Sequence, residues 1–114
     1  EMLRSLVGSE MCIRDRERTM QERIIEQAIV KAAKARSGLA LKFTSPGFAG
    51  MPDRLLLLPK GHIGFVEVKA PGKKPRALQL ARHRQLRNLG FQVFVLDNKE
   101  QIEEILIQIG GDAR

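Results

Sequence analysis

Two acidic residues and one lysine are the strongest candidates for chemistry in this chain. Asp53 ends an irregular loop, and Glu67 and Lys69 lie two residues apart in an apolar run. Side chains alternate along a β-strand, so Glu67 and Lys69 should share one face while Val66 and Val68 occupy the other. Two carboxylates supply the hard oxygen ligands that Mg²⁺ or Mn²⁺ prefers, with water and a phosphate group completing the shell. A neighbouring ammonium could orient or deprotonate an attacking water, or offset negative charge in the transition state.

A hairpin is the element that must position these residues. Residues 54–58 and 63–69 are apolar runs typical of strands, and the Pro-Lys-Gly-His segment 59–62 between them predicts a short turn. Taken alone, Glu67 and Lys69 could also be an ordinary surface ion pair on a half-solvated strand. The spacing of about fourteen residues from Asp53 to Glu67 suits one hairpin and favours a common site instead.

Helices and further strands should flank the hairpin. Residues 20–36 have apolar side chains at three- and four-residue spacing, which predicts an amphipathic helix that ends at Ser37-Gly38, with the glycine in the left-handed conformation. The remaining predictions are an extended piece at 39–44, a loop at 45–52, a basic helix at 76–88 capped by Gly90, a strand at 91–96 and a helix at 99–109. The order α-β-β-β-α-β-α predicts an α/β sandwich with a mixed sheet.

The composition favours a polyanionic partner. The chain has 114 residues, a formal net charge of +7 and a pI near 10.2, so one domain that attracts nucleic acid or an anionic surface is expected. Its longest apolar runs, 55–58 and 91–96, fall far short of the roughly 20 residues of a membrane-spanning helix. Cys12 is the only cysteine, which excludes an intramolecular disulfide and fits a cytoplasmic location.

The first nineteen residues look foreign to the domain. They have no clean helical or strand period, and SLVGSEMCIRDR resembles a translated adaptor sequence. We therefore expect 1–19 to be a non-native or disordered leader and 20–114 to be the domain. The leader carries four basic and four acidic residues, so the +7 belongs to the domain.

The motif residues resemble a known nuclease family. Pro52-Asp53 followed by Glu67-Val68-Lys69 matches the PD-(D/E)xK signature, and the fuller pattern over about 22–97 resembles the VRR-NUC (virus-type replication-repair nuclease) domain. The supporting residues are Lys42-Phe43, Ser45-Pro46-Gly47, Gly50-Met51-Pro52-Asp53-Arg54, Phe65 to Lys73 and Gln79. The resemblance implies a restriction-endonuclease-like three-layer sandwich and Mg²⁺- or Mn²⁺-dependent hydrolysis of DNA phosphodiesters. It also implies Asp53, Glu67 and Val68 as metal ligands and Lys69 as a catalytic residue.

Two further active-site residues follow from the resemblance. In this family a glutamate of the first helix completes the metal site, and Glu22 and Glu26, four residues apart, lie on one helical face. Glu26 is preferred, because residues 26–30 (Glu-Gln-Ala-Ile-Val) resemble the glutamate-led helix of archaeal junction resolvases. Gln79 is expected to form a catalytic hydrogen bond. For each of the three the alternative is an ordinary solvated side chain.

A basic stretch without acidic residues runs from Lys69 to Arg87. Beside a phosphodiester-cleaving centre it predicts a phosphate-contacting surface with salt-dependent affinity. The absence of Trp and Tyr argues against stacking on exposed rings as the main grip. His62 and His83 are interpreted as surface residues, with His83 touching phosphate. The predicted DNA-binding residues are Lys42, Ser45, Arg54, Lys73, Lys74, Arg76, Arg82, His83 and Arg87.

These features predict a structure-selective DNA endonuclease of the Holliday-junction or flap type, phage-encoded or bacterial, acting in replication or repair. A unit of about 95 residues has little surface with which to grip branched DNA, so a homodimer with two centres is expected. One alternative is a non-catalytic nucleic-acid-binding module on the same fold. A sequence-specific restriction enzyme is less favoured, because so short a chain has no room for a recognition domain.

Overall fold

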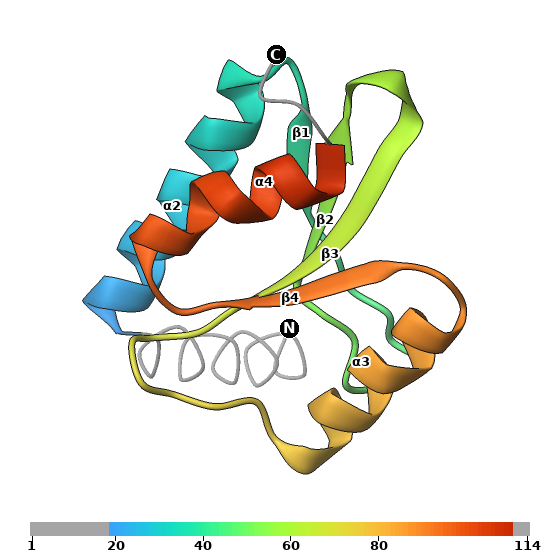
Figure 1. The fold of residues 1–114 in the computed structure, drawn as a ribbon. Helices are drawn as coiled ribbons and strands as arrows, with labels where there is room; N and C mark the ends of the chain where they lie inside the picture. Colours follow the sequence, from blue (N-terminus) through green and yellow to red (C-terminus); the bar gives the residue numbers. More distant parts are fainter. Residues whose placement is uncertain (1–18, 111–114) are drawn as a thin grey trace, which may run out of the picture.

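A four-stranded sheet in the order β1-β2-β3-β4 separates the helices into two layers (Figure 1). The computed structural model describes residues 19–110, so the expected leader, apart from Thr19, and Cys12 lie outside the described residues. The strands are β1 (Leu39–Lys42), β2 (Arg54–Leu58), β3 (His62–Val68) and β4 (Gln92–Leu96). The helices are α2 (Met20–Ala35), α3 (Ala77–Asn88) and α4 (Ile102–Gly110). The predicted α/β sandwich with its α-β-β-β-α-β-α order is confirmed.

The sheet is mixed, as predicted. Strands β1, β2 and β3 are antiparallel neighbours. After β3 the chain crosses over through α3, and β4 pairs parallel to β3. Arg54 pairs with Val66 in the β2–β3 register, and one step further along this register Asp53 lies opposite Glu67. Directly opposed residues of antiparallel strands point to the same face. The hairpin therefore brings both acidic side chains to one face.

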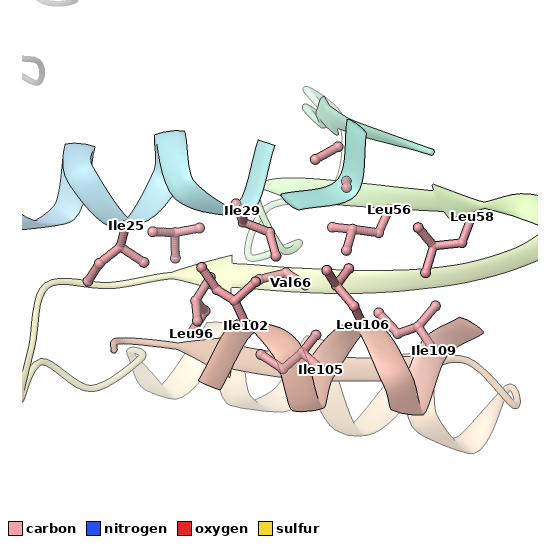
Figure 2. Packing of buried hydrophobic residues seen from close by; sticks show 13 residues of the cluster. Ile25, Ile29, Leu56, Leu58, Val66, Leu96, Ile102, Ile105, Leu106 and Ile109 are labelled. Atoms are coloured by element: carbon pink, nitrogen blue, oxygen red, sulfur yellow. The ribbon is translucent and has the colours of Figure 1, made fainter. Parts of the chain in front are cut away.

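The main hydrophobic core lies between the sheet and the layer of α2 and α4. Figure 2 shows Ile29 of α2 and Leu106 of α4 packing around Val66 of the sheet. All three side chains have no measurable exposure. Alternate residues of β3 supply this core, which leaves Phe65 and Glu67 for the opposite face.

A smaller apolar cluster lies on the α3 face. It contains Phe65, Leu86 and Val93, with Phe43 and Phe91 in edge-to-face contact with Phe65 at centroid distances of 5.8 Å. This cluster fixes α3 against β3 and β4. The face toward α3 thus has a modest apolar anchor and room for polar groups beside it.

The C-terminus of α2 differs from its prediction. Ser37 (φ 65°), not Gly38, takes the left-handed conformation. Gly38 is needed for close approach, because a Cβ there would lie 2.5 Å from the carbonyl oxygen of Leu57. The expected cap at Gly90 is confirmed by its φ of 105°, and most other element bounds differ from expectation by one or two residues. None of the helices between residues 19 and 110 has the length and apolar character needed to cross a bilayer.

Candidate active site

Asp53 lies where the loop enters β2, one residue before the first backbone pair of β2 and β3, and its carboxylate accepts a hydrogen bond from the end of β3. Its Oδ1 accepts a hydrogen bond from the backbone N–H of Val68 at 3.1 Å. Its carbonyl oxygen accepts one from the N–H of Phe43 at 2.9 Å. These two bonds hold the Asp53 carboxylate at the end of β3, beside Glu67.

Glu67 is the centre of the polar group on the α3 face, and it is 3% exposed. Its Oε2 accepts a hydrogen bond from Nε2 of Gln79 at 3.0 Å and forms an ion pair with Nζ of Lys69 at 3.4 Å. The other oxygen, Oε1, faces Nε2 of His83 at 4.0 Å. The structure therefore brings together Asp53, Glu67, Lys69 and Gln79, as the sequence predicted.

Burial changes the acidity of this centre. Desolvation, followed by the nearby Asp53 carboxylate, raises the pKa of Glu67 from 4.5 to about 7, and Lys69 opposes the shift. A buried carboxyl with a second carboxylate beside it resists ionisation. A bound cation would favour the ionised form of both groups.

Gln79 is oriented by the start of α3. Its Oε1 accepts a hydrogen bond from the backbone N–H of Arg76 at 2.8 Å, so its amide nitrogen is turned toward Glu67. This arrangement supports the expectation that Gln79 forms a hydrogen bond in the site, and it explains why α3 must begin directly after Arg76.

The donors on the α3 face fit a hard divalent cation. The carboxylates of Asp53 and Glu67 are oxygen ligands, and Glu67 Oε1 is buried without a hydrogen-bond partner, as an atom that awaits a cation would be. The main-chain carbonyl of Val68, predicted as a further ligand, follows Glu67 directly. Among residues 19–110, no three or more His, Cys, Asp or Glu side chains are grouped so that they could hold a metal. Within this range, the side-chain ligands of the candidate site are therefore the two carboxylates alone.

The expected third acid, Glu26, is placed in an ion pair. Its Oε2 lies 2.7 Å from Nη2 of Arg54, which also donates through Nη1 to the carbonyl oxygen of Ala40. Arg54 pairs with Val66, so by strand alternation it points to the α2 face, away from Glu67. Glu22 is half-buried one turn earlier in α2. A metal role for Glu26 or Glu22 stays a prediction.

The interpretation of His83 as a surface residue was wrong, whereas His62 is exposed as expected. His83 has no measurable exposure, so it cannot touch phosphate from this position. Burial, followed by Arg87 and Lys69, lowers its pKa from the usual 6.5. The sequence held one signal: Gln79 and His83 are four residues apart and share a helical face.

The other predicted DNA-binding residues differ in their exposure and in their contacts. Lys42, Lys73, Lys74 and Arg76 are exposed, which suits contact with phosphate. The remaining arginines make intramolecular contacts: Arg54 binds Glu26, and Nη2 of Arg87 donates to the carbonyl oxygen of Val93. Ser45 is half-buried, and its carbonyl oxygen accepts from the N–H of Phe48.

Arg82 fastens the 45–52 loop to α3. Its Nε donates to the carbonyl oxygen of Ala49 at 2.8 Å, and its guanidinium lies 3.6 Å from the centre of the Phe48 ring. Gly50 (φ 90°) packs so close to Arg82 and Leu78 that a Cβ there would lie 2.9 Å from each side chain. No pattern in the sequence indicated these contacts, which fix the chain just before Asp53.

Two known proteins resemble this chain over most of its length. "Putative nuclease p44" of Acyrthosiphon pisum secondary endosymbiont phage 1 is 49% identical over 83 residues, which cover 73% of this chain and 89% of that protein. A solved structure described as a VRR_NUC domain has a TM-score of 0.72 and 35% identity, covering 79% of this chain and 97% of that one. No family model matches the chain. Both relatives cover the segment that carries the site.

Proposed function

Because the chain belongs to the VRR-NUC family of nucleases, we propose that it is a divalent-metal-dependent DNA endonuclease with its centre at Asp53, Glu67 and Lys69. One observation carries the proposal: a buried carboxylate, Glu67, has one oxygen held by Lys69 and Gln79 and the other without a partner. An ordinary surface ion pair does not explain this burial, since taking a charged group out of water is costly.

Each residue has a separate task in the proposed reaction. Asp53, Glu67 and the Val68 carbonyl would hold Mg²⁺ or Mn²⁺, which supplies Lewis-acid stabilisation of the scissile phosphate and lowers the pKa of water. Gln79 fixes the direction of the Glu67 carboxylate through its amide. Lys69, 19% exposed in its side chain, orients or deprotonates the attacking water or offsets charge on the phosphate.

The exposed basic residues support DNA as the substrate. Lys73, Lys74 and Arg76 lie in the segment that leads from Lys69 to α3, so they can contact the backbone beside the scissile bond. Aromatic residues make up only 4% of the chain, which favours recognition of shape and backbone over base stacking. We infer selectivity for branched DNA, of the junction or flap type, and a role in replication or repair in the cytoplasm of a bacterium.

A cleavage panel tests the proposal. Labelled flaps, four-way junctions, duplexes and single strands are incubated with Mg²⁺, Mn²⁺ or EDTA. We expect metal-dependent incision of a branched substrate, and a loss of about 10²- to 10⁴-fold in Lys69→Ala, the range typical of a proton-transfer residue. Lys31→Ala is the matched control, because Lys31 is exposed on α2. Full turnover in Lys69→Ala contradicts the proposal.

A non-catalytic binding module is the second candidate function. The exposed basic residues alone would account for DNA binding, and binding without any metal-dependent product in the panel would favour this candidate. The completeness of the Asp53, Glu67, Lys69 and Gln79 group argues for catalysis.

We also propose that two copies act together. Leu39, Leu41 and Ile63 lie on the α3 face of the sheet beyond the area that α3 covers, and each is more than 40% exposed. Leu39 and Ile63 flank Leu57 in register, so they form one apolar patch. A second copy that buries the same patch would place two centres on one branched substrate. We expect a dimer by light scattering and a monomer for Ile63→Lys; a wild-type monomer contradicts this.

A further inference from the structure

His83 occupies a position that packing alone does not explain. Its ring is fully buried, and neither Nδ1 nor Nε2 has a hydrogen-bond partner among the described residues. An unsatisfied buried polar group destabilises the folded state, and an apolar side chain of similar size avoids that cost. Filling space on the α3 face therefore does not explain why a histidine occupies this position.

The carboxylate of Glu67 is the polar group that the ring of His83 faces. Nε2 of His83 lies 4.0 Å from Oε1 of Glu67, and Oε1 is itself buried and without a partner. The other oxygen of this carboxylate is held by Gln79 and Lys69. Gln79 and His83 are one turn apart on α3 and so lie on one face of the helix. Gln79 contacts Oε2 of the Glu67 carboxylate, and His83 faces Oε1.

We propose that His83 is a positioning residue that holds the Glu67 carboxylate in its metal-binding orientation. Nε2 of the ring donates to one lone pair of Oε1 after a small closing movement, which leaves the other lone pair of Oε1 for the cation. Hydrogen bonds at a catalytic centre are often long before the site is loaded and shorten afterwards. Gln79 and His83 then fix the plane of the carboxylate from two sides. The inference rests on the proposed function, because it assigns Glu67 to a metal.

Three variants test the proposal in Mn²⁺ titrations by calorimetry without DNA. His83→Leu fills the space and removes the donor, whereas His83→Gln keeps an N–H donor at a similar reach. Leu86→Val loosens the packing of α3 one turn further on, where Leu86 is buried against Phe65 and Val93. Thermal unfolding in EDTA reports whether each variant is folded.

We expect His83→Leu to bind Mn²⁺ at least about tenfold more weakly, the usual effect of removing a group that orients a metal ligand. Its melting temperature in EDTA should equal or exceed that of the wild type, because two unsatisfied nitrogens are gone. His83→Gln should recover most of the affinity. Leu86→Val should lower the melting temperature and leave Mn²⁺ affinity unchanged.

The outcomes separate this inference from the proposed function. If the wild type neither binds Mn²⁺ nor cleaves DNA, the proposed function fails. If the wild type does both and His83→Leu binds Mn²⁺ equally well, only the role of His83 is overturned. A parallel loss of affinity in Leu86→Val would also overturn it, since the effect would then come from packing.

Discussion

The two faces of the sheet differ in how they satisfy their buried acidic side chains. On the α2 and α4 face, the buried acid Glu26 has a close ion pair with Arg54 beside a large apolar core, and only Nε of Arg54 is buried without a hydrogen-bond partner among the described residues of that face. On the α3 face, Glu67 and His83 are buried against a small apolar cluster, and three of their polar atoms have no partner. A fold that optimised stability alone would not leave these groups unsatisfied.

The difference assigns separate tasks to the two faces. The α2 and α4 face supplies the apolar burial that stabilises the domain, whereas the α3 face holds charges at a cost in stability. Unsatisfied and strained groups are typical of functional sites, where the rest of the fold supports them. Substitutions of the buried polar groups on the α3 face should therefore change chemistry, whereas substitutions in the core on the other face should change stability.

The largest effect is expected at Glu67. Glu67→Gln keeps the size and loses the charge, so cleavage should fall about 10³-fold or more, roughly 4 kcal/mol of transition-state stabilisation. Rates at saturating Mn²⁺, compared with those of Glu104→Gln on the exposed surface of α4, measure the loss. Wild-type rates in Glu67→Gln would show that the α3 face is not the active site.

The same variant should change the dependence of stability on pH. The pKa of Glu67 is about 7 in the folded protein and 4.5 in the unfolded chain. Between these values the folded state binds more protons at Glu67, so the contribution of Glu67 to wild-type stability should fall as pH rises from 4.5 to 7 and then level off. The change is on the order of 3 kcal/mol, since one pKa unit corresponds to about 1.4 kcal/mol. Urea unfolding without metal should show this slope in the wild type and not in Glu67→Gln.

The next effect concerns stability on the opposite face. Leu106 is fully buried in α4, so Leu106→Ala should lower the free energy of unfolding by about 3 kcal/mol. Leu89→Ala, at a position 69% exposed, is the control. Cleavage per folded molecule should not change. A selective loss of cleavage in Leu106→Ala would contradict the division between the faces.

A smaller effect is expected at the paired acid. The side chains of Arg54 and Glu26 are 14% and 9% exposed. Glu26→Gln weakens their ion pair and should therefore lower the free energy of unfolding by about 2 kcal/mol. Chemical denaturation measures this loss. A Mn²⁺ titration of the same variant sharpens the comparison: weakened binding would add the predicted metal role of Glu26 to its structural one, and unchanged stability would refute the structural one.

The smallest effect should come from the exposed basic segment. Lys73→Gln with Lys74→Gln removes two phosphate contacts, so DNA affinity should fall about tenfold and the slope of log affinity against log salt should drop by about 0.9 per contact. Binding is measured in EDTA at several salt concentrations. Lys31→Gln with Lys34→Gln, exposed on α2, provides the control. Equal losses in both pairs would indicate a general charge effect.

The sequence by itself determined the order of elements and the group of Asp53, Glu67 and Lys69, to which the family resemblance added Gln79. These inferences use local information: strand alternation, turn residues and motif spacing fix which side chains share a face. The hairpin register then places Asp53 opposite Glu67. The glycine at 38 showed the limit of local rules, because its small size is required by β2 and not by the end of α2.

Only the tertiary structure decided what surrounds each charged group. The burial of His83, the pairing of Glu26 with Arg54 and the contact of Arg82 with the 45–52 loop all join segments far apart in the chain. The basic composition of α3 predicts that its side chains are exposed. One face of the helix nevertheless packs against β3, and His83 on that face is buried. Desolvation and electrostatic coupling depend on distance in space, and sequence spacing does not specify that distance once the chain leaves an element.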